Sequence, residues 1–172
     1  MKKLLIIFFI SFLSVYGVSA QDQEGKFSLA GNLSYGTKIE SLGLGLRAQY
    51  GFTENIRGAL EYKYYLDRRN VSAWGTTADV HYVFGVSDAV SLYPIGGLTF
   101  SRWTLDLGRT NIPGVDLGEL EAKTSENRLG LNLGFGGQIA LGDKTFLQIE
   151  AKEALIKDYT QFVISVGFMY QF

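Results

Sequence analysis

The residues closest to catalytic chemistry are His81 and Asp79, because the chain's only histidine stands two positions after a carboxylate. A histidine near an acid can act as a general base, but hydrolytic chemistry also needs a nucleophile. No serine follows at His-x-Ser spacing, since the next three residues are Tyr82, Val83 and Phe84. The chain has no cysteine, and one histidine is too few for a transition-metal site. We therefore expect a hydrogen-bonded structural histidine, with no catalytic residue, metal or cofactor.

The second set of candidates consists of charged residues that stand among apolar ones. Such charges are costly to bury alone and are tolerated when they are paired and hydrogen-bonded. The set is Arg47, Arg57, Glu61, Lys63, Asp79, His81, Glu150 and Lys152. Two glycine-rich stretches, 43–45 and 134–137, have the composition of phosphate-binding loops, but such loops need a strand-to-helix junction, and no helical pattern follows. We expect these glycines to leave room for large neighbours inside a barrel.

The element that positions these residues is seen most clearly in the last stretch, 160–172. Apolar side chains alternate there with polar or small ones, and the apolar set is Phe162, Ile164, Val166, Phe168, Tyr170 and Phe172. A period of two residues is the mark of a strand with one apolar face.

Alternation of this kind marks eight segments, and no helical period survives beyond residue 20. The segments are 27–35, 42–52, 56–67, 74–86, 90–100, 128–141, 147–152 and 160–172. Pro94 and the pair Gly96 and Gly97 interrupt the pattern of the fifth. Tight turns follow the second, fourth and sixth segments, and the longest connection is 104–124. The pattern predicts an all-β fold, an eight-stranded antiparallel up-and-down transmembrane β-barrel with its short turns in the periplasm.

A soluble barrel would also alternate, so the composition of the two faces decides between the classes. The polar face is mostly Gly, Ser, Asn and Gln, which suits the crowded interior of a narrow barrel. Aromatic residues gather at two levels of the apolar face, as a bilayer's two interfaces select. They are Phe27, Tyr50, Phe52, Phe84, Tyr170 and Phe172 near the short turns, and Tyr35, Tyr64, Trp74, Phe100 and Phe162 near the long loops. We therefore expect lipid outside and polar groups inside.

The order of segments, the stretch LYPIGGL at 92–98 and the ending FMYQF at 168–172 resemble the OmpA/OmpX-type small porin-like outer-membrane barrels. The resemblance covers essentially the whole of 21–172. It implies that Phe168, Tyr170 and Phe172 form a signal that the barrel assembly machinery reads. It also implies contact with outer-membrane lipid and lipopolysaccharide. No peptidoglycan-binding domain follows the barrel in this sequence, so we do not expect a role in tethering the cell wall.

The turn at 53–55 allows one strand register to be predicted. If Phe52 pairs with Ile56, Arg47 lies directly opposite Glu61. Extending the sheet across the connection near Asn70 predicts further pairs. These are Lys63 with Asp79 and Glu61 with His81. Independently of this register, Glu150 and Lys152 add another pair on the seventh segment. The alternative is that each group is hydrated separately in a wet lumen.

The first 20 residues have the layout of a secretory signal peptide. Lys2 and Lys3 precede an apolar run at 4–15, and small residues precede a cleavage site between Ala20 and Gln21. Removing the two lysines reduces the 16 basic residues to 14 against 17 acidic ones, a net charge of −3. With no basic block, we expect no nucleic-acid partner. The mature chain, 21–172, is expected to be one barrel domain in the outer membrane of a Gram-negative bacterium.

The function hypotheses concern the ends and the interior of this barrel. The loop 104–124 mixes apolar and charged residues. Such a loop is either a surface that binds an extracellular ligand or an inert extension. Arg102 faces either lipopolysaccharide phosphates or solvent. The leading hypothesis is a structural or surface-interaction protein whose lumen is plugged by charged side chains. A small-solute channel is the alternative. A lipid-modifying barrel enzyme comes third, because it would need a histidine open to the membrane.

Overall fold

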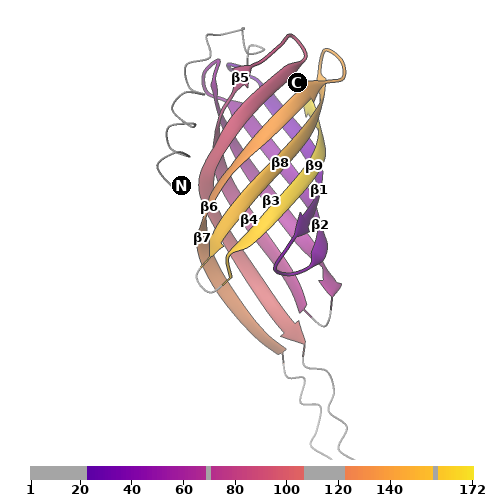
Figure 1. The fold of residues 1–172 in the computed structure, drawn as a ribbon, viewed down its shortest axis with the longest axis vertical. Helices are drawn as coiled ribbons and strands as arrows, with labels where there is room; N and C mark the ends of the chain where they lie inside the picture. The colour runs from indigo at the N-terminus through magenta and orange to yellow at the C-terminus, as the bar shows by residue number, and fades with distance from the viewer. Residues whose placement is uncertain (1–22, 69–70, 107–122, 157–158) are drawn as a thin grey trace, which may run out of the picture.

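The alternating segments form strands that close into one antiparallel barrel (Figure 1). The computed structural model describes residues 23–68, 71–106, 123–156 and 159–172, so the predicted signal peptide with Ala20 and Gln21 lies outside it. The strands are β1 (Phe27–Gly36), β2 (Ser41–Gly51), β3 (Ile56–Arg68), β4 (Val71–Tyr82), β5 (Phe84–Gly85), β6 (Val90–Asp106), β7 (Lys123–Ala140), β8 (Thr145–Ile156) and β9 (Gln161–Gln171). Strands β1 to β4 pair in sequence order, and so do β5 to β9; β1 also pairs with β9, and β6 pairs with β4 as well as with β5. In the described part of the chain, no helix is long and apolar enough to cross a membrane.

The short strand β5 continues β4 after a one-residue break at Val83, so the described wall has eight strands, as predicted. The break lies across from Pro94, between the pairs His81↔Ile95 and Phe84↔Leu92. Proline has no N–H to donate to a ladder, so regular pairing is lost there. The Val83 N–H donates instead to the Asn55 carbonyl at 2.7 Å. β6 itself runs unbroken through the residues that the sequence pattern had marked as an interruption.

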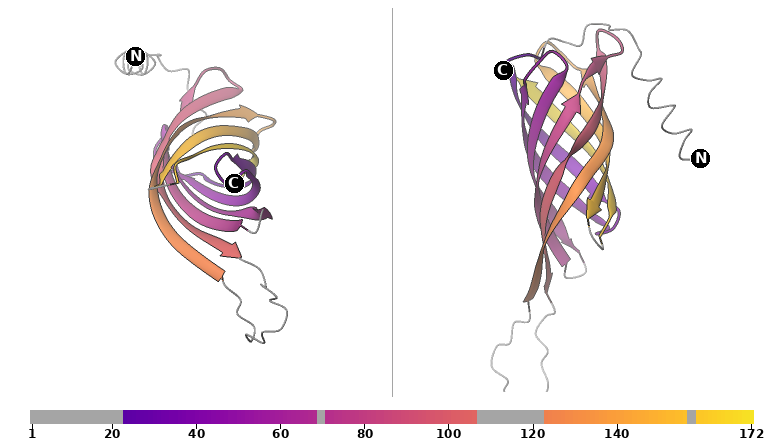
Figure 2. Two further views of the ribbon diagram at one scale, coloured as in Figure 1. Left: turned by 60° about the horizontal axis from the view of Figure 1, so that its bottom comes forward. Right: turned by 90° about the vertical axis from the view of Figure 1, so that its left-hand side faces the viewer.

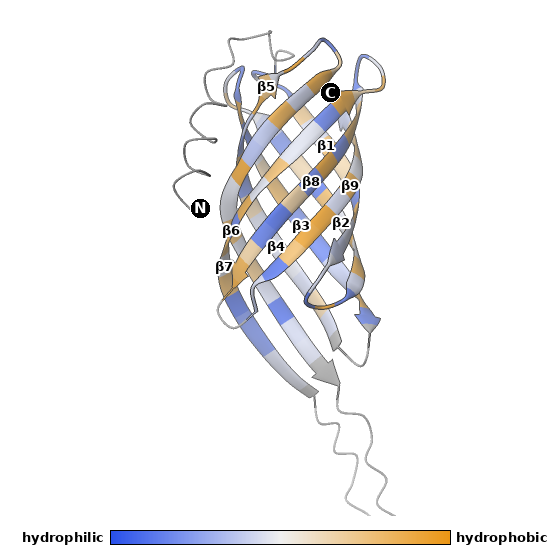
Figure 3. Cartoon of the chain, viewed as in Figure 1, coloured by the Kyte–Doolittle hydropathy of each residue, from blue (hydrophilic) through white to orange (hydrophobic). Residues whose placement is uncertain are grey.

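The barrel has its apolar face outside and its polar face inside. Leu46 is 73% exposed, whereas the next residue, Arg47, is 2% exposed. Bands of apolar residues run over the outer wall (Figure 3), and exposed apolar side chains project from every long strand. A water-soluble barrel would have the reverse arrangement, so the orientation of the faces is the one predicted for a membrane barrel.

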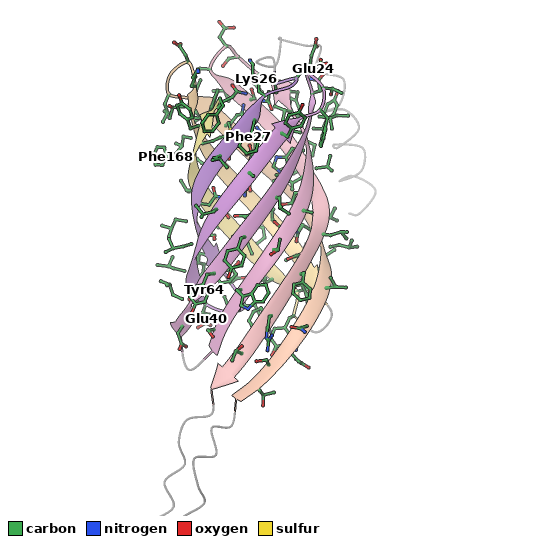
Figure 4. All side chains as sticks on the ribbon, turned by 180° about the vertical axis from the view of Figure 1, so that it is seen from behind. Glu24, Lys26, Phe27, Glu40, Tyr64 and Phe168 are labelled. Carbon is green, nitrogen blue, oxygen red and sulfur yellow. The ribbon has the colours of Figure 1, made fainter. Side chains whose placement is uncertain are left out.

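Aromatic rings meet at both ends of the outer wall. At the short-turn end, the ring centroids of Phe27 and Phe172 lie 6.0 Å apart and those of Tyr50 and Phe52 5.3 Å apart. At the other end, Trp74 lies 6.0 Å from Tyr62 and 5.9 Å from Phe100. Figure 4 shows Phe27 and Phe168 near the first end and Tyr64 near the second. These two levels match the positions expected of interfacial girdles.

The hairpin of β6 and β7 extends beyond the rest of the wall (Figure 2). β4 follows β6 as far as the pair Val71↔Leu105, but β8 leaves β7 at the pair Gly130↔Ile156. Among the described residues, β7 from residue 123 to 127 therefore has β6 as its one strand partner. Residues 104–106 and 123–124, which the sequence pattern assigned to a loop, belong to these strands. The remainder of that loop, 107–122, lies outside the described residues.

Candidate functional site

The centre of the lumen is an ion cluster built around Glu61 and Arg47. The 53–55 turn sets the register, because the Phe52 N–H donates to the Ile56 carbonyl at 2.8 Å and Arg47 then lies opposite Glu61. Arg47 Nη2 is 3.2 Å from Glu61 Oε2. The same guanidinium also holds Glu150 through both nitrogens, with Nη2 to Oε2 at 2.6 Å. All three side chains are at most 2% exposed. Because Glu61 belongs to β3 and Glu150 to β8, Arg47 bridges two strands on opposite sides of the barrel.

Lys152 ties the remaining acids together. Its Nζ lies 2.9 Å from Asp79 Oδ2, 3.4 Å from Glu61 Oε2 and 3.5 Å from Glu150 Oε2. The Lys63 ammonium adds a contact to Glu61 at 3.4 Å.

Two asparagines complete this cluster. The Asn32 amide donates to Glu61 at 3.0 Å, and the Asn132 amide donates to Asp79 at 2.9 Å. Glu61 thus has two ammonium groups, one guanidinium and one amide around a single carboxylate, which is the pairing that a buried charge requires.

Two of the predicted pairs are not formed. Glu61 lies opposite Thr77 and Arg57 lies opposite His81. Relative to the predicted register, the partner of Glu61 is therefore displaced by four residues along β4. A register shift by an even number of residues keeps every side chain on its own face, so the alternation in the sequence cannot distinguish the two registers. Asp79 finds its cation across the lumen in Lys152 rather than in Lys63.

Arg57 and His81 form a second group nearer the short turns. The Arg57 Nε donates to His81 Nδ1 at 3.3 Å, and Nη1 donates to Gln138 at 2.8 Å and to Gln23 at 3.4 Å. The guanidinium carbon lies 4.8 Å from the centre of the Tyr93 ring. His81 is fully buried, and its ring stacks on Tyr93 with centroids 4.9 Å apart. Because His81 is fully buried and accepts a hydrogen bond from Arg57, it holds Arg57 and Tyr93 in place and is not accessible to a substrate.

Tyr93 is the functional residue that the sequence pattern missed. Its side chain is fully buried in the lumen, and its hydroxyl donates to Glu150 at 3.1 Å, which links the two groups of charges. A Cβ at Gly136 would overlap the Tyr93 ring, so that glycine is what makes room for it. The available signal was an aromatic residue at an inward-facing position, with a glycine on the neighbouring strand. Sequence reasoning missed it because it treats the alternation as interrupted at Pro94.

Apolar side chains close the lumen on both sides of the charges. Near the short turns, Phe146 and Met169 pack against Ala30. Near the hairpin end, Trp103 and Tyr65 pack with Ile39 and Ala73. An eight-stranded barrel has an interior about wide enough for side chains to fill, and here they fill it at several levels.

The other predicted sites lie on the outer wall or on strands. Phe168, Tyr170 and Phe172 point outward at the short-turn end, and the Phe172 N–H donates to the Phe27 carbonyl at 2.9 Å. Arg102 is exposed next to Trp74 on the neighbouring strand. The glycine stretches lie within β2 and β7 and have strands on both sides, so they form no phosphate-binding loop.

A closed barrel with this inside-out arrangement matches a known family. The sequence profile of the outer membrane protein beta-barrel domain matches residues 6–172. The chain belongs to this family. It is an outer-membrane β-barrel protein, and comparison with curated proteins gives no match.

Solved structures of small outer-membrane barrels share the fold. The N-terminal β-barrel domain of Pseudomonas aeruginosa OprF has 17% identity and a TM-score of 0.69, over 87% of this chain and 98% of that one. Neisserial surface protein A has 15% identity and a TM-score of 0.64, over 86% and 96%. Ail, the attachment invasion locus protein of Yersinia pestis, has 16% identity and a TM-score of 0.57, over 87% and 99%. At these identities the likeness establishes the fold of the barrel.

Proposed function

We propose that this protein is a non-conducting outer-membrane barrel with a structural or surface-interaction role, in which the β6–β7 hairpin is presented outside the cell. The observation that carries the proposal is the ion cluster that crosses the lumen at mid-height. Its three cations and three acids are all at most 5% exposed. An ion or solute would have to displace several paired charges to pass, and breaking such pairs is costly.

The hairpin supports the interaction role. Residues 123–127 of β7 have strand geometry, and in the described structure one of their edges lies outside the β6 ladder. Such an edge presents backbone donors and acceptors on which an extended segment of another protein can add as a strand. The chemistry therefore favours an extended peptide partner, held mainly by backbone hydrogen bonds along the described start of β7.

The lipid surface is the second proposed partner. Arg102 projects from β6 beside Trp74, at the level of the aromatic girdle near the hairpin. A guanidinium at that depth can form bidentate hydrogen bonds with lipopolysaccharide phosphates. Arg102→Gln should weaken binding to lipopolysaccharide-containing bilayers, whereas the outward-facing Glu153→Gln on β8 should leave it unchanged or strengthen it.

We also propose that the signal peptide is cleaved between Ala20 and Gln21. Gln23, the first residue that the structure describes, is 4% exposed and contacts Arg57, so the described barrel packing includes a residue close to the proposed site. The intact mass of protein extracted from outer membranes should correspond to 21–172. A mass that includes residues 1–20 would contradict this cleavage.

Conductance separates the proposed role from a small-solute channel. In planar bilayers, the wild-type barrel should show little or no steady current. Large, stable openings would refute the plug and favour a channel. A lipid-modifying activity is not part of the proposal, because His81 faces the lumen and is fully buried.

Binding separates an active hairpin from an inert one. Cells that display the wild type should retain partner protein that cells displaying a variant with residues 101–128 replaced by a short turn do not retain. Substitution of prolines at 125 and 127 should weaken binding without shortening the hairpin, because proline removes edge donors. Equal retention by all three would contradict a role for the edge.

A further inference from the structure

A small cavity lies inside the barrel between the ion cluster and the apolar side chains at the hairpin end. Its volume is about 40 Å³. Lys63, Lys152 and Asn132 line the side that faces the ion cluster, and Tyr65, Trp103 and Ile156 line the other. One water needs roughly 10–15 Å³ by this measure, so the space suits a few waters or one halide-sized ion.

Lys63 brings unfilled donor capacity to this cavity. An ammonium group has three N–H donors. Lys152 directs its donors at three acids, whereas Lys63 has one ion-pair contact in the described residues, to Glu61 at 3.4 Å. The side chain of Lys63 is 7% exposed, against 4% for Lys152, although both are enclosed by the barrel. Lys63 therefore has donor capacity beyond its single contact, in a space that it lines.

The cavity wall adds neutral donors. The Thr77 hydroxyl lines the cavity and is buried without a hydrogen-bond partner in the described structure. The Ser101 oxygen accepts the indole N–H of Trp103 at 3.1 Å, which leaves the serine's own hydrogen free to donate. Gln161 also lines the cavity, and its amide oxygen has no hydrogen-bond partner in the described structure, although the same amide carries two N–H donors. An ammonium and two hydroxyl hydrogens in one space suit an acceptor that has no hydrogens of its own.

The charge of the interior points the same way. Arg47, Lys63 and Lys152 balance Glu61, Asp79 and Glu150, three cations against three acids. Arg57 is a fourth buried cation, and its described partners are the neutral groups of Gln23, His81, Gln138 and Tyr93. The buried side chains of the described residues therefore have an excess of one positive charge. An uncompensated charge in a low-dielectric interior is unfavourable, and a bound anion would offset it.

We propose that this cavity binds one halide-sized monovalent anion, held by the Lys63 ammonium and the Thr77 and Ser101 hydroxyls. Chloride is the ion of this class that surrounds the cell. The ion would accept the unused hydrogen bonds of the cavity at the hairpin end, and it would neutralise the excess positive charge of the buried side chains. Two ammonium groups on the cavity lining exclude a cation.

Tryptophan fluorescence offers a direct test, because the chain has only two tryptophans. Both tryptophans contribute to the cavity lining, but the Trp74 ring packs against Tyr62 and Phe100 on the outer wall, so Trp74 is replaced to leave the signal of Trp103 alone. In a Trp74→Phe background, bromide titrated against gluconate should quench Trp103 with a saturable curve, since heavy halides quench an indole in contact with them. Adding Lys63→Met should weaken the apparent bromide affinity about tenfold or more, as expected from the loss of a charge-assisted hydrogen bond. The matched control Lys144→Met, in an exposed turn, should leave the curve unchanged.

Crystals grown in bromide supply the second measurement. Anomalous diffraction should place one bromide beside Lys63 Nζ in the wild type and none there in the Lys63→Met variant. Both barrels must first migrate as folded protein in unboiled gels. Quenching that is absent, or equally linear in all variants, together with an empty or water-filled cavity, would overturn the proposal.

Discussion

Removing the Glu61 carboxylate is the most informative perturbation of the lumen. Glu61→Ala withdraws the acid that Arg47, Lys63 and Lys152 share, and it leaves the Asn32 amide without its acceptor. Arg47 keeps its two bonds to Glu150, so it is not stranded by this change. The cluster is nevertheless left with three cations against two acids.

The expected cost is about 3–5 kcal/mol of unfolding free energy, the usual effect of removing one partner from a buried ion pair. The unsatisfied Asn32 amide belongs to the same loss, since an orphaned buried donor costs about 1–3 kcal/mol. With a denaturant slope of about 2 kcal/mol per molar urea, the unfolding midpoint should fall by about 2 M. Glu61→Gln keeps the volume and one acceptor, so its loss should be smaller.

Urea titration of the barrel in lipid vesicles, followed by tryptophan fluorescence, measures this shift. The matched control is Glu153→Ala on β8, whose side chain faces outward and is exposed, and it should move the midpoint by less than about 0.5 M. Planar-bilayer recordings of the same proteins should show a small leak in Glu61→Ala and none in the control. A Glu61→Ala barrel as stable as the wild type, with unchanged conductance, would refute the ion cluster as the element that closes the lumen.

Three further outcomes follow from the same structure. Leu46→Arg places a charge on the lipid face at mid-height, where Leu46 is 73% exposed, and should cost about 2–4 kcal/mol in vesicle titrations, whereas an effect below 1 kcal/mol would argue against lipid contact there. Tyr93→Phe removes the hydrogen bond to Glu150 and should cost about 1–2 kcal/mol, and a neutral result would mean that the hydroxyl does not contribute. Deleting Phe172 should leave unfolded protein in the periplasm while purified protein still refolds in detergent, because the residue makes one backbone bond and outer-wall ring contacts; normal outer-membrane yields would contradict its role as an assembly signal.

The faces and turns of the barrel are predictable from sequence because they depend on neighbours along the chain. Alternation decides which side of each strand is apolar, and the tight 53–55 turn leaves one register, which places Arg47 opposite Glu61. The connection near Asn70 permits two registers, one with Glu61 opposite His81 and one with Glu61 opposite Thr77, four residues away along β4. Both put Lys63 and Asp79 inside, so periodicity has no means of choosing between them.

The contacts across the lumen are beyond sequence reasoning for a different reason. Arg47 meets Glu150, and Lys152 meets Asp79, from strands that are not adjacent in the sheet. Which residues face each other across a barrel depends on the tilt and shear that close it, a property of the whole ring and not of any one hairpin. Tyr93 links Glu150 to Arg57 and His81, and its place depends on the glycine at 136 on the neighbouring strand.

Because β1 pairs with β9, the strands form a closed ring, and the pairing of its strands does not depend on where along the ring the chain starts. Ser28 pairs with Gln171, and the Phe172 N–H reaches the Phe27 carbonyl, so the two ends of the barrel sequence lie side by side at one rim. A circular permutant that joins these ends through a short linker and opens the turn at 142–144 would retain every strand pair. Its last strand would then be β7 in place of β9. If that permutant refolds in detergent but fails to enter the outer membrane in cells, the order of strands matters to the cell and is immaterial to the fold.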